Sequence, residues 1–248
     1  MKISIITVCW NSAATIEKTI RSLQEQNYND IEYIIVDGNS KDETLNIIKK
    51  YPQVISKWIS EPDKGLYDAM NKGIKMATGD YVGIVNADDT LASPNVISET
   101  VDFLKNHNVG ASLGNIVQHN NDGKILRHYS AAKWSPEKLK IGFMPAHPGI
   151  FFKRELFDKL GYYALDFKIA ADYELITRFF LKNKISWAYS NIVTHRMLVG
   201  GVSSSGWESY KKVSEEIMKA LKMNQISYST FKIKSRAVWK IFGFLKRK

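Results

Sequence analysis

The first half of the chain alternates short runs of aliphatic and β-branched residues with longer stretches in which apolar residues recur every three or four positions. The short runs predict buried strands, and the longer stretches predict amphipathic helices. The predicted strands are residues 3–8, 31–36, 54–59 and 81–85, and the predicted helices are residues 12–24, 40–48, 66–76 and 93–104. Such alternation predicts an α/β fold with a mostly parallel sheet and helices on both of its faces.

The second half is less regular. Residues 109–117 and 124–129 are β-rich and flank Asp122-Gly123, a turn sequence that predicts a hairpin. Two further helices are expected at residues 153–160 and 171–182, followed by a strand at 185–189. From about residue 207 the pattern becomes helical and basic, so we expect a boundary near residue 205.

One local signal concerns the start of the second predicted helix. Ser40 and Glu43 have the spacing of a capping box, in which the serine hydroxyl and the glutamate carboxylate bind the first free N–H groups of a helix. The sequence therefore predicts that Ser40 caps this helix.

Composition sets the broad class of the protein. The 248 residues are 44% hydrophobic and 24% charged, as in ordinary globular domains. The single cysteine, Cys9, excludes an internal disulfide framework and fits a reducing compartment. The apolar run after Lys2 is too short for a signal peptide, and no run approaches the ~18 residues of a membrane-spanning helix, so we expect a cytoplasmic protein.

The net charge of +10 is concentrated at one end of the chain. Residues 211–248 contain eleven Lys or Arg and two Glu, whereas the other 210 residues carry 24 basic and 23 acidic side chains. A neutral body argues against nucleic acid as the main partner. The basic end is a separate feature that needs its own explanation.

Acidic residues follow three of the predicted strands. Asp37 directly follows the second, Asp63 follows the third, and Asp88 and Asp89 follow the fourth. Ligands of open parallel sheets bind beyond the carboxyl ends of the strands, so we expect these carboxylates to share one site. Clustered carboxylates and substrate phosphates are how proteins usually hold Mg²⁺ or a similar hard cation. The alternative for each acid alone is a solvated loop residue.

Five segments carry a family resemblance. They are "SIITVCWNSAATIEKTIRSL", "YIIVDGNSKDET", "EPDKGLYDAMNKGIKMATGDYVGIVNADD", "IAADYELITRF" and "VGGVS". In this order the segments resemble family-2 glycosyltransferases of the GT-A fold, in the branch that builds bacterial surface polysaccharides of the colanic acid, capsule and O-antigen type. The resemblance covers residues 1–205 and implies a Rossmann-like mixed sheet, with a nucleotide-sugar half (1–110) and an acceptor half (111–205).

The resemblance implies a role for particular residues. Asp172 matches the catalytic base, and His147 lies where the family has acceptor-facing residues. Expected metal ligands are Asp88, Asp89 and His195, with Mn²⁺ or Mg²⁺ as the cofactor. The residues that match the nucleotide-sugar contacts are Thr7, Trp10, Asn11, Asp37, Asp63, Lys64, Asp68, Asn71, Asn86, Ala87 and Asp88. Asn86 departs from the family, where Asp is more common.

Three of these assignments have structural alternatives. Asp172 also suits the first turn of a helix, where the helix dipole favours an acid. His195 can be an ordinary structural histidine, and His147 can be a turn residue held between two prolines.

The implied activity is an inverting, metal-dependent transfer of a sugar, with a UDP-sugar as the favoured donor and a saccharide or polyprenyl-pyrophosphate-linked acceptor. A sugar nucleotidyltransferase is an alternative, but the loop "CWNSAAT" lacks the glycine-rich basic sequence that holds a triphosphate. The same loop lacks the G-x-G-x-x-G of a dehydrogenase. A non-catalytic, membrane-associated binding module is the remaining alternative. A homodimer also stays open.

The basic end, residues 206–248, is expected to be a helical tail. On a helical wheel of residues 236–248, Val238, Ile241 and Leu245 share one face, and Arg236 and Lys240 lie opposite. A basic amphipathic helix with aromatic residues is typical of a membrane interface. The sequence therefore predicts a peripheral protein at the cytoplasmic face of the bacterial membrane, or else a helix whose apolar face packs on the body.

Overall fold

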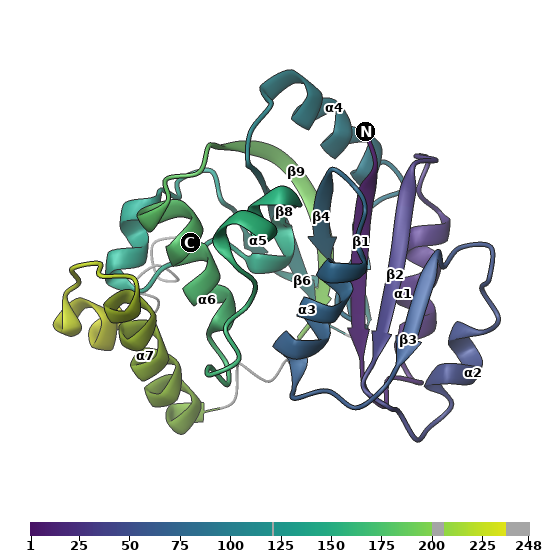
Figure 1. The fold of residues 1–248 in the computed structure, drawn as a ribbon, viewed down its shortest axis with the longest axis horizontal. Helices are drawn as coiled ribbons and strands as arrows, with labels where there is room; N and C mark the ends of the chain where they lie inside the picture. Colours follow the sequence, from purple (N-terminus) through teal and green to yellow (C-terminus); the bar gives the residue numbers. More distant parts are fainter. Residues whose placement is uncertain (121, 200–205, 237–248) are drawn as a thin grey trace. The chain divides into compact units, whose positions relative to one another are not determined.

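The computed structural model describes residues 1–120, 122–199 and 206–236 (Figure 1). The chain divides into two compact units. The first unit consists of Met1–Ala132, Pro145–Tyr163 and Ile185–Val199, and the second of Lys133–Met144, Ala164–Lys184 and Gly200–Lys248. The sequence predicts one boundary near residue 205, but the chain passes between the units several times, and helix α7 (Gly206–Met223) belongs with segments from the middle of the chain.

The first unit contains a mixed sheet in the order β3-β2-β1-β4-β8-β6-β9-β5. The first four of these strands are parallel, as the sequence predicts, and their arrows point the same way in Figure 1. They are β1 (Ile3–Cys9), β2 (Ile31–Asp37), β3 (Lys57–Ser60) and β4 (Tyr81–Ile84). In this register Cys9 lies opposite Asp37, and Asp37 lies opposite Ser60.

The other half of the sheet mixes directions. Strand β8 is antiparallel to both β4 and β6, whereas β9 is parallel to β6. These strands are β5 (Thr90–Leu91), β6 (Ala111–His119), β7 (Ile125–Tyr129), β8 (Ile150–Lys153) and β9 (Trp187–Leu198). The predicted hairpin is confirmed, since β7 pairs antiparallel with β6.

Helices cover the sheet of the first unit. They are α1 (Ile16–Gln24), α2 (Thr44–Ile48), α3 (Leu66–Met76), α4 (Val96–His107) and α5 (Glu155–Leu160). Every residue of β1 is buried, which fits its continuous apolar sequence. Helix α3 packs directly on β1, because a Cβ at Gly73 would lie only 2.5 Å from Ile6 Cγ2. This close packing fixes where the first turn of α3 lies beside the strand ends.

The capping-box prediction is wrong. The residue before α2 is Glu43, with no side-chain cap, and Ser40 lies further upstream. The Ser40 hydroxyl instead donates to Asp37 Oδ1 and accepts the N–H of Asn11 at 2.7 Å. The buried carboxylate at the end of β2, three residues before Ser40, is thus the partner of this serine instead of the helix end, and the serine becomes part of the strand-end network.

The second unit is helical. It contains a 3₁₀ turn at Pro136–Ile141 (η1) and helix α6 (Ala171–Ile176), which continues as a π-helical turn over Thr177–Lys182 (η3). Helix α7 packs on α6, and its apolar residues Ile217, Ala220 and Leu221 are at most 3% exposed. Residues 230–236 are also helical.

Part of the predicted tail lies outside the described residues. Residues 237–248, which carry most of the predicted amphipathic pattern, are not described. The same holds for most of the "VGGVS" segment. Of the helices in the described part of the chain, none is both long and apolar enough to cross a bilayer.

Candidate functional site

Loops at the carboxyl ends of β1 and β2 are tied together by hydrogen bonds. The backbone N–H of Ser12 donates to Thr44 Oγ1 at 2.8 Å, and that of Ala13 donates to Asp42 Oδ2 at 3.0 Å. Asn11, whose φ of 47° lies in the left-handed region, accepts the N–H of Lys41 at 2.8 Å through its side chain. These polar contacts hold the backbone after β1 in one conformation.

Asp37 is the centre of this network rather than an exposed contact. Its carboxylate is fully buried and accepts hydrogen bonds from the Ser60 hydroxyl at 2.6 Å, from the Ser40 N–H at 2.9 Å and from the Ser40 hydroxyl. The Cys9 thiol also points at it, with Sγ 3.6 Å from Oδ1. A buried carboxylate is stable only with such partners. Asp37 therefore braces three strand ends, and this geometry argues against direct contact between its side chain and a nucleobase.

Trp10, Gly38 and Asp63 lie close together next to Asp37, with Trp10 exposed and the other two half-buried. The Trp10 side chain is 68% exposed, an unusual state for the largest apolar residue. A Cβ at Gly38 would lie 2.5 Å from Asp63 Oδ2 and 3.5 Å from Trp10 Cβ, so the glycine lets both side chains approach the backbone. The Trp10 ring, the Asp63 carboxylate and the Gly38 backbone therefore lie next to one another. The sequence pointed to Trp10 and Asp63 but missed Gly38, whose signal is a glycine directly after a strand-ending Asp.

Asp63 also begins the turn into α3. Its Oδ1 accepts the N–H of Gly65 at 2.8 Å, and Asp68 Oδ2 accepts the N–H of Lys64 at 3.0 Å. Gly65 has a φ of +111°, a conformation that favours glycine, and is the N-cap residue of α3. The Lys64 side chain is exposed. The turn thus presents one positive side chain at the same edge of the sheet as Trp10.

Residues 86–89 follow β4 and place two adjacent carboxylates in different environments. Asp88 is exposed, whereas Asp89 is only 2% exposed. The Asn86 amide donates to Asp89 Oδ2 at 3.0 Å, and Thr19 Oγ1 lies 2.7 Å from the Asp89 backbone oxygen and 3.0 Å from that of Ala87. Burial, with a smaller contribution from the Asp88 charge, raises the pKa of Asp89 to about 7, and the Asn86 hydrogen bond acts in the opposite direction.

The Asn86 amide has a specific partner in this structure, the carboxylate of Asp89. A carboxylate at this position would face the Asp89 carboxylate and repel it, whereas the amide donates a hydrogen bond to it. The asparagine thus supports the ionised form of its buried neighbour.

The carboxylate pair fits a divalent cation that is held jointly with substrate phosphates. Among the described residues, no three His, Cys, Asp or Glu side chains come together as a metal site. Asp88 is exposed and Asp89 is buried, and the Asp88 charge contributes to the raised pKa of Asp89. One or two carboxylates together with phosphate oxygens are the usual ligands of Mg²⁺ at phosphate-binding sites.

The structure argues against the predicted metal role of His195. This residue is fully buried in β9, with Nε2 3.1 Å from the Ile84 backbone oxygen and Nδ1 2.9 Å from Thr194 Oγ1. Burial lowers the pKa of His195 to about 4, so the ring is neutral and uses Nε2–H to bind the end of β4. His195 therefore supports the strand that leads to Asp88, with both ring nitrogens within hydrogen-bond distance of protein oxygens.

Thr7 has a comparable supporting position. Its hydroxyl is buried, donates to the Val85 backbone oxygen at 2.8 Å and accepts the Tyr33 hydroxyl at 3.0 Å. It joins β1 to the segment that follows β4. The Thr7 hydroxyl thus holds the start of the 86–89 loop, and its predicted nucleotide contact stays a prediction.

Asn71 and His147 meet at Tyr163, which the sequence reasoning missed. The Asn71 amide makes two 2.9 Å hydrogen bonds with the Tyr163 backbone, one to its oxygen and one from its N–H. The Tyr163 hydroxyl lies 2.5 Å from His147 Nε2, and the Tyr67 ring stacks on Tyr163 at 5.6 Å between centroids. Asn71 therefore does not project freely as a donor contact, and it holds the tyrosine that orients His147.

Asp172 lies in the second unit, in the first turn of α6. The N–H of Tyr173 lies 2.7 Å from Asp172 Oδ1. Ala170, the N-cap residue of α6, donates its N–H to Glu216 Oε2 of helix α7 at 2.8 Å. Glu216 lies in the region that the sequence assigned to the tail, and nothing in the local pattern distinguishes it from the neighbouring Glu215.

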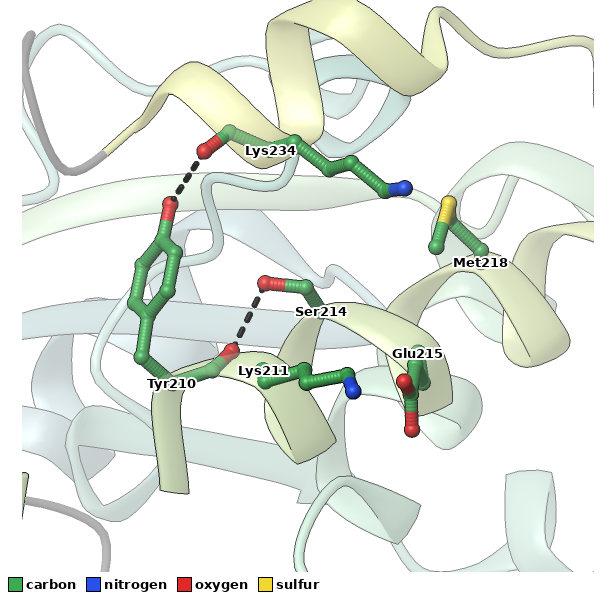
Figure 2. A pocket seen from close by; sticks show the side chains of 6 residues that line it. All are labelled: Tyr210, Lys211, Ser214, Glu215, Met218 and Lys234. Carbon is green, nitrogen blue, oxygen red and sulfur yellow. Dashed lines mark hydrogen bonds between the residues drawn. The ribbon is translucent and has the colours of Figure 1, made fainter. Parts of the chain in front are cut away.

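A hollow of about 290 Å³ lies between α7 and the helical segment 230–236 of the second unit (Figure 2). The Tyr210 hydroxyl donates to the Lys234 backbone oxygen at 3.0 Å, and the Ser214 hydroxyl to that of Tyr210 at 2.7 Å. The residues that line the hollow are Tyr210, Lys211, Ser214, Glu215, Met218 and Lys234. The predicted site residues all lie elsewhere in the chain.

The chain is similar to a known family and to curated relatives. Residues 4–169 match the family described as Glycosyl transferase family 2. An uncharacterized glycosyltransferase of Mycobacterium tuberculosis is 33% identical over 178 residues, which cover 71% of this chain and 68% of the relative. A PGL/p-HBAD biosynthesis glycosyltransferase of Mycobacterium bovis is 28% identical over 228 residues, which cover 89% of this chain and 84% of the relative.

Two solved structures share the fold. S. aureus TarS 1–349 in complex with UDP-GlcNAc has a TM-score of 0.70 at 20% identity, with 89% of this chain and 66% of that chain covered. The mannosyltransferase PcManGT from Pyrobaculum calidifontis in complex with GDP-Man and Mn²⁺ has a TM-score of 0.66 at 20% identity, with 95% and 68% covered. This chain thus spans about two thirds of each of these structures.

Proposed function

Since the chain belongs to glycosyltransferase family 2 and has the GT-A fold, it is a nucleotide-sugar-dependent glycosyltransferase, and we propose that it transfers the sugar of a UDP-sugar with inversion at the anomeric carbon. The observation that carries the proposal is the surface at the ends of β1–β4. An exposed Trp10 beside Gly38 and Asp63 suits a nucleobase and ribose, and the exposed Asp88 suits the diphosphate side. We assign donor binding to the first unit.

The reaction requires stabilisation of the negative charge on the leaving diphosphate and removal of the proton of the acceptor hydroxyl. Negative charge grows on the β-phosphate as the glycosidic bond breaks, and Mn²⁺ or Mg²⁺ bound by Asp88, with Asp89 beside it, would stabilise that charge. Lys64, exposed at the start of α3, is a second positive group for the diphosphate. The acceptor hydroxyl loses a proton as its oxygen attacks the anomeric carbon, and the Asp172 carboxylate is our candidate to accept it.

The acceptor is proposed at the level of chemical class. The Mycobacterium bovis relative is named for PGL/p-HBAD biosynthesis. Together with the motifs of the surface-polysaccharide branch, this name favours a saccharide acceptor carried on a lipid, such as a polyprenyl pyrophosphate. His147, held by Tyr163, is the side chain that we propose to contact the acceptor.

Binding of the donor can be tested without knowledge of the acceptor. We expect UDP with Mn²⁺ to raise the melting temperature of the protein by several degrees, because a ligand at 100 times its Kd adds about 2.7 kcal/mol of stability. GDP with Mn²⁺ is the control for the identity of the base, and UDP with EDTA is the control for the requirement for metal. A panel of UDP-GlcNAc, UDP-glucose and GDP-mannose then identifies the sugar by slow hydrolysis. Stabilisation by no nucleotide in the presence of metal would contradict the proposal.

We propose further that the basic end of the chain binds the membrane surface. The described part of this region already carries exposed cationic side chains such as Lys211 and Lys222, and Phe231 is 78% exposed. Each basic residue near an anionic surface contributes about 1 kcal/mol. Deletion of residues 237–248 leaves α7 in place and removes four Lys or Arg.

We expect this deletion to weaken cosedimentation with phosphatidylglycerol vesicles at least about tenfold, with little binding of either form to phosphatidylcholine vesicles. The melting temperature is measured in parallel to show that the body of the protein is intact. Equal binding of the full chain and the truncated chain to anionic vesicles would exclude this role for residues 237–248.

A further inference from the structure

Glu216 of α7 holds the segment that leads into α6. Its Oε1 accepts the N–H of Lys168 at 2.9 Å, and its Oε2 accepts those of Ile169 and Ala170 at 2.9 and 2.8 Å. Hydrogen bonds to an ionised acceptor are about twice as strong as neutral ones. Three successive N–H groups on one carboxylate therefore fix the backbone of this segment, which ends two residues before Asp172.

Helix α7 and Asn224, the residue directly after it, hold the same stretch of chain at both sides of Asp172. Before it, Lys219 Nζ lies 2.6 Å from Asp166 Oδ2. After it, the Asn224 amide donates to Glu174 Oε1 at 3.1 Å, and the Glu174 carboxylate is also bound by Arg178 at 3.0 and 2.8 Å. All these contacts lie within the second unit. The short helix that carries Asp172 thus takes its position from α7.

We propose that Glu216 is a positioning residue for Asp172: it sets the backbone before α6 so that the Asp172 carboxylate is presented in one orientation to the acceptor hydroxyl. This inference rests on the proposed function, in which Asp172 is the general base. A base works only within hydrogen-bond reach of the proton that it accepts. Because a misplacement of about 1 Å can cost about 10²-fold in rate, the anchor matters for turnover even though Glu216 does not touch the substrate.

The first test is the variant Glu216→Gln, which keeps the size of the side chain but turns an NH₂ group toward N–H donors. With the panel donor that the wild type hydrolyses fastest, we expect kcat to fall about 10- to 10²-fold and the donor KM to stay within about twofold. Glu215→Gln is the matched control, since Glu215 is the neighbouring residue and lines the hollow in Figure 2. It should behave as the wild type. A changed KM with an unchanged kcat would overturn the proposal.

A double-mutant cycle separates positioning from general damage. If Glu216 acts through Asp172, Glu216→Gln costs nothing further in an Asp172→Asn background, because the group that it positions is already inactive. If kcat of the double variant fell by the product of the two single-variant factors, Glu216 would act independently of Asp172, and the inference would be overturned. Near-normal turnover of Asp172→Asn alone would instead reject the assigned base, so the two failures are distinguishable.

Hydrogen exchange gives a measurement that does not depend on turnover. We expect the amides of residues 168–170 to exchange at least about tenfold faster in Glu216→Gln than in the wild type, with the amides of Ile3–Cys9 unchanged. Unchanged protection at 168–170 would show that the three hydrogen bonds do not hold this segment. Loss of protection in both segments would mean a general loss of the fold and would also overturn the positioning role.

Discussion

Replacement of Asp172 by Asn is expected to lower kcat by about 10²- to 10⁴-fold, the usual contribution of a general base. Asparagine has nearly the same shape, and its Oδ1 can keep the short contact with the Tyr173 N–H. Donor binding should persist, because the residues that we assign to the donor lie in the first unit. The measurement is kcat and KM for the fastest panel donor, together with calorimetric binding of UDP in the presence of Mn²⁺.

Asp102→Asn is a suitable control for the same chemical change, since Asp102 is an exposed residue of α4. It should keep both kcat and the affinity for UDP. If Asp172→Asn turned over near the wild-type rate, the base would have to be another group. If it lost UDP binding as well, Asp172 would belong to the donor site.

The sequence predicted the parallel half of the sheet well because burial on both faces leaves a continuous apolar run. β1 and β2 show such runs, and α3 was predicted with its observed bounds because its period is clear. β9 was predicted as residues 185–189 but runs over Trp187–Leu198. Most of its residues are only half-buried, and apolar and polar residues are mixed along it without strict alternation, so its length depends on pairing with β6 and not on local pattern.

For the site, the sequence predicted which residues follow the strands but not which way their side chains point. Asp37 and Asp88 look alike in the sequence, yet one is fully buried and the other exposed. The difference arises from Ser40, three residues further along the chain, and above all from Ser60, which only the pairing of β2 with β3 brings to Asp37. His195 likewise gains the Ile84 carbonyl as its partner from strand packing. Partners distant in sequence decide whether a polar residue braces the site or faces a ligand.

The basic end of the chain shows the same limit. Its composition left open whether the region binds a membrane surface or packs its apolar face on the body, because charge counts do not distinguish a solvated face from a packed one. In the structure, α7 buries Ile217 and Leu221 and binds the segment before α6 through Glu216. Cationic side chains can therefore face solvent on a helix whose other face is a structural part of the second unit.

Replacement of Asp88 by Asn is expected to lower kcat/KM by at least about 10²-fold, the scale of losing one group that stabilises developing charge. The loss should be accompanied by weaker binding of UDP in the presence of Mn²⁺ and by little change without metal. Asp102→Asn again controls for the loss of one exposed carboxylate. A wild-type response to Mn²⁺ in Asp88→Asn would show that another group binds the cation.

The pH dependence of the same variant tests the pairing of the two acids. The pKa of Asp89 is raised to about 7, so the folded state holds its proton where the unfolded chain has lost it, and this residue's contribution to stability falls as pH rises from about 4 to 7. A cation needs the ionised form, so Mn²⁺ affinity in the wild type should rise with pH and level off above about 7. In Asp88→Asn the neighbouring charge that helps to raise the pKa of Asp89 is gone, so the rise should move to lower pH. An unshifted pH profile would mean that the two carboxylates do not interact, and the shared cation site would then lose its electrostatic basis.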